Sequence, residues 1–330
     1  MSHPAICTGI PQRPRLEGVS DKVSSSGSGR APKGKSRSAT QAAAREHARQ
    51  LREAQKKRDQ RRRMLIVVGA PVLIVVLIVV GFVIVKANQA PSTVTGAAAT
   101  PAGSVLEKSL STIPAATFDA VGTGTGVAAP TRVTGNPLTA DNKPRVLYIG
   151  AEYCPYCAAQ RWAVVTAMSR FGAFTGLGVT TSSALDVFPS TATLSFHGAT
   201  YASSLLAFTG VEQTTNIPKV AGDASSGYTA LDSISAADQA LLSKYNSAGS
   251  IPFVDFGNTF VTVGASYQPT VLAGLSQTQI AADLHDPNSA VAKSVLGAAN
   301  MMTAILCGMT KSQPAAVCTS TAVTTQKLPA

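Results

Sequence analysis

The chain has 330 residues, of which 45% are hydrophobic, so it can bury a sizeable core and is not a wholly disordered protein. Its net charge of +11 is unevenly distributed: residues 1–63 contain 16 Lys and Arg against 5 Asp and Glu (16 − 5 = +11), and residues 64–330 contain 12 of each. The positive charge therefore belongs to an amino-terminal tail, which excludes a basic nucleic-acid-binding face on a folded domain.

The amino-terminal tail has two parts. Residues 1–38 are rich in Ser, Gly, Pro, Lys and Arg. Such a segment cannot bury enough apolar surface to offset the entropy of ordering, so we expect it to be disordered. Residues 39–63 contain strong helix formers without an apolar stripe, which predicts a solvated basic helix. Because an apolar segment follows directly, anionic lipid headgroups are favoured over nucleic acid as the partner of this helix.

The apolar segment at residues 64–85 has the properties of a membrane span. It contains no charged side chain and would extend roughly 33 Å as a helix. Three arginines precede it, and Lys86 follows it. We therefore expect a single transmembrane helix at 64–86 that leaves the amino terminus in the cytoplasm and the remaining chain outside the cell membrane. A cleaved signal peptide and a buried core helix are the alternatives, but both usually have shorter apolar segments.

The rest of the chain predicts a linker and one domain. Residues 87–115 are rich in Ala, Thr, Ser, Pro and Gly, which is typical of a flexible linker, and residues 116–330 have a globular composition. The elements expected in the domain are a strand at 145–151, a helix at 158–171, a strand at 191–196, a helical insert at about 203–248, a hairpin at 250–264 and a helix at 288–306. Ser276 and Gln279 form a capping-box signature. This order of elements indicates an α/β fold.

Five cysteines divide by their expected compartment. Cys7 lies in the cytoplasmic tail and is expected to be unpaired, whereas the other four face an oxidising space, in which disulfides persist. Cys307 and Cys318 predict a structural disulfide, with a second redox pair as the alternative. Cys154 and Cys157 form the second pair.

The Cys154–Cys157 motif lies between a predicted strand and a predicted helix, with Pro155 and Tyr156 between its cysteines. Free N–H groups and the positive end of the helix dipole stabilise a thiolate in this first turn. We therefore expect Cys154 to be the nucleophile and Cys157 the resolving thiol, while Pro155 fixes the geometry of the turn. A zinc site would need more ligands, and a purely structural bridge would close too small a ring to stabilise the fold much. Redox chemistry without a metal or cofactor is the preferred interpretation.

These motifs resemble the thioredoxin fold. The "YCPYC" turn is followed about 95 residues later by "SIPF", in which Ile251 and Pro252 match the position of the fold's cis-proline. The resemblance implies that Pro252 packs against the sulfurs and that Ile251 offers backbone hydrogen bonds to a substrate. The helical insert is similar to that of the secreted DsbA kind of oxidoreductase. The buried aspartate of thioredoxin would align near Tyr148, which favours an oxidase or isomerase over a general reductase.

A second resemblance is more specific. Across about residues 115–325 the chain resembles a family of membrane-anchored thioredoxin-like proteins, called domain of unknown function nine-two-nine. The motifs that carry it are "GAEYCPYCAAQRWAVV", "SRFGAF", "SIPFVDFGN" and the ending "AAN…AILC…QPAAVC". It implies a thioredoxin-like domain and a dithiol site but no particular substrate.

Five other side chains have weaker signals. Glu152 precedes the motif and is expected either to be solvated or to relay protons. We expect Trp162 in the core and Arg161 on the surface, from where its charge could also lower a thiol pKa. His197 is interpreted as a surface or packing residue rather than a base, and Asp255 is expected to satisfy the hairpin turn.

The sequence thus predicts a membrane-anchored, extracytoplasmic thiol–disulfide oxidoreductase that acts on cysteines of secreted or envelope proteins. Analogy with DsbA-type systems suggests a quinone-linked redox partner in the membrane. A non-catalytic envelope binding module on a thioredoxin-like scaffold is the alternative function, and metal delivery through the dithiol is a third.

Overall fold

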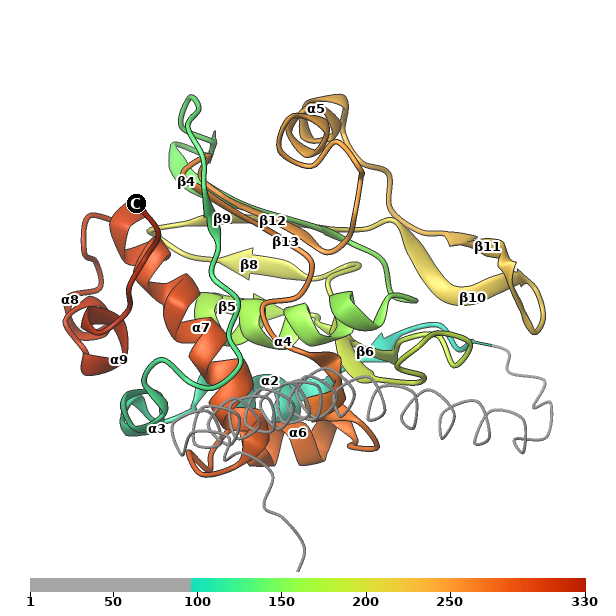
Figure 1. Ribbon diagram of the computed structural model, residues 1–330, viewed down its shortest axis with the longest axis horizontal. Coiled ribbons are helices and arrows are strands. Elements are labelled where there is room, and N and C mark those ends of the chain that lie inside the picture. Colours follow the sequence, from blue (N-terminus) through green and yellow to red (C-terminus); the bar gives the residue numbers. More distant parts are fainter. Residues whose placement is uncertain (1–95) are drawn as a thin grey trace, which may run out of the picture. The chain divides into compact units, whose positions relative to one another are not determined.

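A computed structural model describes residues 96–330 (Figure 1). The predicted tail at 1–63, the predicted transmembrane helix at 64–86 and Cys7 lie outside the described residues. Part of the predicted linker is ordered: strand β1 (Thr100–Pro101) pairs with a later strand, and helix α2 (Gly103–Ser111) buries two leucines. The folded domain therefore begins before residue 116.

The centre of the domain is a mixed sheet built around β4 (Lys143–Gly150). This strand pairs in parallel with β9 (Ala207–Glu212) and antiparallel with β12 (Phe253–Phe256). Next to β12 lies β13 (Phe260–Val263), which forms a hairpin with it. Two short strands complete the sheet: β2 (Thr131–Arg132) and β3 (Thr139–Ala140). The expected α/β class is confirmed.

Helices cover both faces of the sheet (Figure 1). The helices α4 (Pro155–Met168) and α7 (Ala290–Met309) pack on one face, and α5 (Ala236–Tyr245) covers the other. Among the described residues, α7 is the one helix long and apolar enough to cross a membrane, and 72% of its most apolar segment is buried within the domain.

The alternation of side chains along β4 explains these two layers. Val146 and Tyr148 belong to the core under α4 and α7, whereas Leu147 and Ile149 pack with Leu242 of α5. Because successive side chains of a strand point to opposite faces, an unbroken apolar run is suited to a strand covered on both sides.

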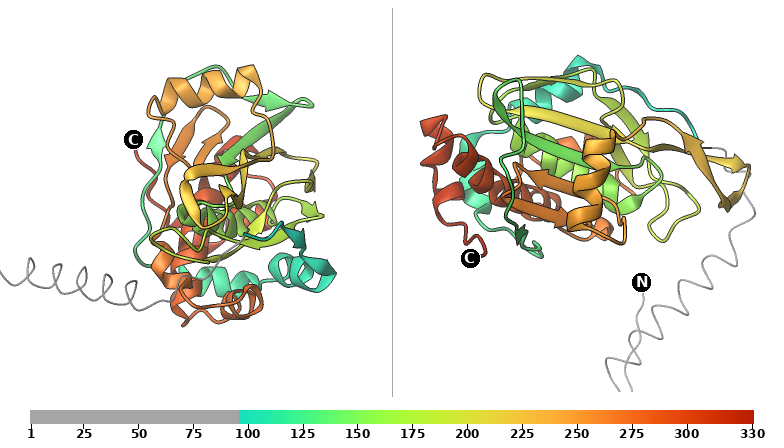
Figure 2. Two further views of the ribbon diagram at one scale, coloured as in Figure 1. Left: turned by 90° about the vertical axis from the view of Figure 1, so that its right-hand side faces the viewer. Right: turned by 90° about the horizontal axis from the view of Figure 1, so that it is seen from above.

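The helical insert expected at about 203–248 is mostly strand. The helix predicted within it is confirmed as α5, but the insert also contains β9, β10 (Thr214–Val220) and β11 (Asp223–Ala230). Further strands lie between α4 and the insert: β5 (Ala173–Thr175), β6 (Gly178–Thr181), β7 (Ala192–Ser195) and β8 (Thr200–Ala202). The strand predicted at 191–196 is confirmed as β7. Hairpin β10–β11 turns at Gly222 (φ +77°) and extends away from the central sheet (Figure 2). The β-branched threonines of β6, β7 and β10 favour strand over helix in this region.

Three other sequence expectations are confirmed. The hairpin expected at 250–264 turns at Gly257 and Asn258, both with positive φ, and the backbone N–H of Asn258 donates to Asp255. Ser276 and Gln279 form a capping box at the start of α6 (Gln277–Asp283).

The remaining short helices are α3 (Ala115–Val121), η1 (Pro269–Leu272), α8 (Ala315–Cys318) and α9 (Thr321–Thr324).

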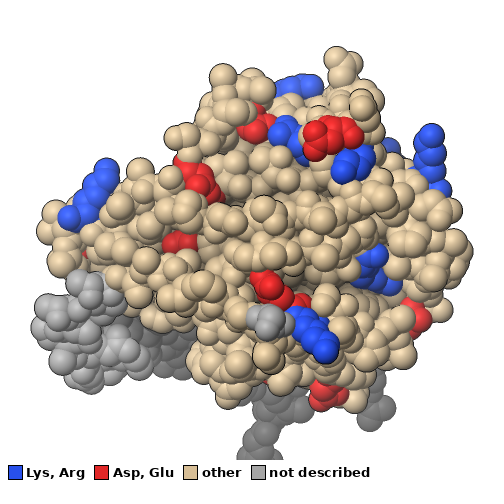
Figure 3. Space-filling view, turned by 180° about the vertical axis from the view of Figure 1, so that it is seen from behind, with Lys and Arg blue, Asp and Glu red and all other residues tan. Residues whose placement is uncertain are grey.

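Charged side chains are scattered over the face of the domain seen in Figure 3, with basic and acidic groups interspersed. This distribution agrees with the balanced charge of residues 64–330.

Candidate active site

Cys154 and Cys157 lie where β4 leads into α4. Cys154 is the N-cap of α4, Pro155 is its first residue, and the backbone N–H of Cys157 donates to Cys154 Sγ at 3.3 Å. Cys154 is 6% exposed, Cys157 is fully buried, and both are free thiols. The sulfur that reaches solvent is therefore also the one at the positive end of the helix.

The two thiols differ in acidity. The hydrogen bond from the Cys157 thiol lowers the pKa of Cys154, and backbone N–H groups of the first turn and the charge of Arg161 act in the same direction, while burial opposes them. Burial raises the pKa of Cys157 well above its ordinary value, and the neighbouring Cys154 adds to this effect. Cys154 is thus the thiol that ionises first.

The loop before β12 lies beside Cys154, 97 residues later in the chain. Cys154 Sγ is 3.9 Å from the carbonyl oxygen of Ile251. The Ile251–Pro252 peptide bond is cis, and Pro252 is buried. The structure therefore brings Ile251, Pro252 and the dithiol together.

A buried ion pair that the sequence did not predict supports the site. Arg161 is fully buried rather than on the surface, because its Nε and Nη2 donate to the two carboxylate oxygens of Glu212, each at 2.7 Å. Nη2 also donates to the carbonyl oxygen of Ala151, three residues before Cys154, at 2.7 Å. Glu212 is the last residue of β9 and pairs with Gly150 at the end of β4. The ion pair thus joins α4, β9 and the segment that leads into the motif.

Glu152 is also buried, which excludes the expectation that it is solvated. It accepts a hydrogen bond from the Ser195 hydroxyl at 2.6 Å, and burial raises its pKa against the effects of Ser195 and Arg161. Glu152 Oε2, Tyr148 Oη and Arg161 Nη1 are among the buried side-chain atoms of the described domain that have no hydrogen-bond partner. His197 is exposed and pairs with Asp232 at 2.6 Å, in agreement with a surface role.

Two tyrosines lie close to Cys154 in the sequence, and each contacts a second aromatic ring. Tyr153 stacks on Tyr228 of the β10–β11 hairpin, with ring centres 4.2 Å apart. Tyr156 is exposed and contacts Phe188 edge to face at 5.7 Å.

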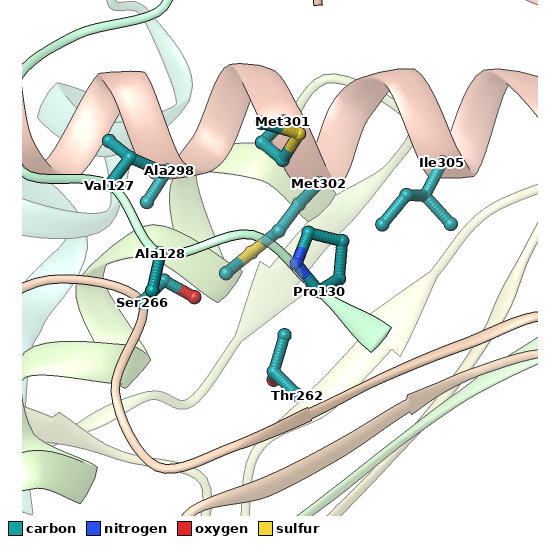
Figure 4. A pocket seen from close by; sticks show the side chains of 9 residues that line it. All are labelled: Val127, Ala128, Pro130, Thr262, Ser266, Ala298, Met301, Met302 and Ile305. Carbon is teal, nitrogen blue, oxygen red and sulfur yellow. The ribbon is translucent and has the colours of Figure 1, made fainter. Parts of the chain in front are cut away.

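Other parts of the domain do not add to this site. Cys307 and Cys318 form a disulfide that links α7 to α8. Residues 96–330 contain no cluster of three or more His, Cys, Asp or Glu side chains that could hold a metal ion. A mostly apolar pocket between α7 and the chain before β2 has a volume of about 10 Å³, which is room for a single water molecule (Figure 4).

Comparison with known proteins gives one match. The model of a family described as Domain of unknown function (DUF929) matches residues 129–308, which is 180 of the 330 residues. The matched region includes both cysteines of the motif and the Ile251–Pro252 loop. No curated protein and no solved structure matches the chain significantly.

Proposed function

Because the chain belongs to the DUF929 family, whose description assigns no activity, we propose a function from the chemistry of its own site: thiol–disulfide exchange. The observation that carries the proposal is the difference in pKa and in burial between the two thiols. Cys154 caps a helix and has a lowered pKa, whereas Cys157 is fully buried and has a raised pKa. A nucleophile and a resolving thiol need this difference.

The proposed reaction is a two-electron exchange. The Cys154 thiolate attacks a substrate disulfide, forms a mixed disulfide and releases one substrate thiolate. Cys157 loses its proton and attacks Cys154 Sγ, which breaks the mixed disulfide, forms the Cys154–Cys157 disulfide and releases the second substrate thiolate. The protein dithiol is oxidised and the substrate disulfide is reduced; the reverse sequence oxidises a substrate dithiol. We assign Glu152, a buried carboxyl group with a raised pKa, as the acceptor of the Cys157 proton.

The order of strands supports a thioredoxin-like fold as the framework for this chemistry. The strands β9, β4, β12 and β13 lie side by side in this order, with β9 parallel to β4 and the other two antiparallel to their neighbours. Helix α4 follows β4, and α7 follows β13 along the chain. In such a fold, the backbone of Ile251 would pair with an extended segment of the substrate next to Cys154.

We further propose that the domain acts outside the cell membrane, anchored by the segment at 64–86. Its substrates would be secreted or envelope proteins that contain cysteines, and its redox partner would be a quinone-linked membrane protein. The basic tail would bind anionic lipid headgroups on the cytoplasmic side.

Thiol trapping in cells tests the proposal. Cys157→Ala should accumulate mixed disulfides with substrates, because Cys154 attacks but nothing resolves the product; the matched variant Cys154→Ala should trap none. Both are read on non-reducing gels with the full-length chain. If neither variant traps a partner, and glutathione buffers do not convert the free dithiol to a disulfide, the domain is a non-catalytic binding module.

A further inference from the structure

A second pocket lies at the carboxyl end of α4, at the opposite end of this helix from the cysteines. It has a volume of about 230 Å³ and lies between α2, α3, the residues that end α4, and α8. One part of its wall is apolar and includes Leu110, Ile113, Phe118 and Val317, and the other part is polar and includes Ser111, Thr166 and Ser169. Arg170 is the one cationic side chain that lines it.

Arg170 has no carboxylate partner among the described residues. Its Nη1 and Nη2 donate to neutral oxygens, Asn300 Oδ1 at 3.3 Å and Ser320 Oγ at 3.4 Å, and its guanidinium lies 4.4 Å from the centre of the Phe118 ring. The nearby Asp119 instead accepts a hydrogen bond from the backbone of Ala322 at 2.7 Å. Burial lowers the pKa of Arg170 to about 10, so the side chain is still a cation at neutral pH.

The lack of a carboxylate partner distinguishes Arg170 from two other arginines of the described domain that are partly or fully buried. Arg145 pairs with Asp238, and Arg161 pairs with Glu212. A partly buried cation is less stable without an anion beside it, and the carboxyl end of a helix supplies only about half a negative charge. Arg170 also has five N–H donors, of which two have partners in the described chain.

We propose that this pocket binds a small carboxylate with an apolar chain. The carboxylate accepts hydrogen bonds from the free N–H groups of Arg170, and the chain lies against Leu110, Ile113, Phe118 and Val317. A single guanidinium neutralises a single negative charge, which favours a monoanion over a dianion such as a phosphate monoester. The pocket has room for about seven waters, which suits a short chain rather than a long acyl tail. This proposal is independent of the thiol chemistry.

Equilibrium dialysis of the full-length chain in phosphatidylcholine nanodiscs tests the site. The probes are radiolabelled octanoate and octanamide, which have similar shape but differ in charge, and empty nanodiscs give the background of membrane partition. We expect saturable binding of octanoate at one site per chain, with octanamide at least tenfold weaker. Equal binding of the two probes, or no binding above background, overturns the proposal.

Two variants and one control connect the binding to this pocket. Arg170→Gln should weaken octanoate at least tenfold. Arg132→Gln is the matched control, because Arg132 is an exposed arginine that also lies over a phenylalanine ring, and it should leave binding unchanged. Ala316→Leu adds volume to the pocket wall and leaves the charge of Arg170 in place, so it should also weaken octanoate binding. This variant tests the site independently if Arg170→Gln does not fold. Unchanged octanoate binding in either pocket variant contradicts the assignment.

Discussion

Replacement of Glu212 by glutamine tests the buried ion pair in depth. The two side chains have nearly the same size, so Glu212→Gln leaves no cavity, but it turns one of two 2.7 Å acceptors into an amide that faces the Arg161 guanidinium. Both partners are fully buried, so the arginine charge remains in the interior without a counter-ion. Breaking such a pair costs about 3–5 kcal/mol, which agrees with two charge-assisted hydrogen bonds of about 1.5–3 kcal/mol each.

Urea unfolding of a fragment that spans residues 90–330 measures this loss. Trp162 is the single tryptophan of the chain and lies buried on the same helix as Arg161, so its fluorescence reports unfolding. With a slope of about 3 kcal/mol per molar urea, the midpoint should fall by about 1–2 M. Asp141→Asn, which removes an exposed carboxylate, should change stability by less than about 0.5 kcal/mol.

A double variant separates the charge from the packing. Arg161→Met combined with Glu212→Leu removes both charges, so its stability should lie within about 2 kcal/mol of the original protein and above that of Glu212→Gln. The reasoning is refuted if Glu212→Gln loses less than about 1 kcal/mol, or if the double variant is as unstable as the sum of its single changes.

Three further predictions use the same fragment and urea assay. Cys307→Ser opens a disulfide with a sequence separation of 11 and should cost about 3 kcal/mol of loop-closure entropy; no loss at all would contradict this. Gly150→Ala places a Cβ in steric conflict with the hydroxyl of the buried Tyr148 and should cost about 1–3 kcal/mol, whereas Gly308→Ala, which meets open space in α7, should be neutral or stabilising. Burial raises the pKa of Asp255 to about 6, above the value of about 3.9 in the unfolded chain, so the folded state binds this proton more tightly. The stability that this proton contributes is present below about pH 4 and is lost as the pH rises to about 6. The free energy of unfolding of the original protein should therefore fall by about 3 kcal/mol across this range, and that of Asp255→Asn should not. Equal pH profiles of the two proteins would exclude the assignment.

The sequence predicted the parts of the site that local chemistry determines. The first turn of α4 follows from Pro155 after an apolar run, and Cys154 becomes its N-cap for the same reason. The hairpin at Gly257 and Asn258 follows from residues that tolerate positive φ. Each of these signals lies within a few residues of the feature it determines.

The supporting ion pair needed information that short-range patterns do not contain. Arg161 lies four residues after Cys157, on the same face of the helix, which was an available signal. Its burial depends on Glu212, and Glu212 reaches it only because β9 pairs in parallel with β4. Helix α4 and the short strands β5 to β8 separate the two strands, and β9 itself lies in the segment at about 203–248, whose alanine and serine content suggested helix instead. The burial of Glu152 could not be predicted for the same reason, because its hydrogen-bond partner Ser195 comes from β7, which is distant in the sequence.

The position of β4 in the sheet has a consequence for the order of events in folding. Val146 pairs with Phe208, 62 residues later (208 − 146), and Tyr148 pairs with Val254, 106 residues later (254 − 148). Pairings this distant in sequence are slow to form, because the loops between them must close first. During synthesis both thiols of the motif therefore emerge well before β9 and β12, and the central sheet that leads into the motif can be completed only when the chain has been extended past residue 256.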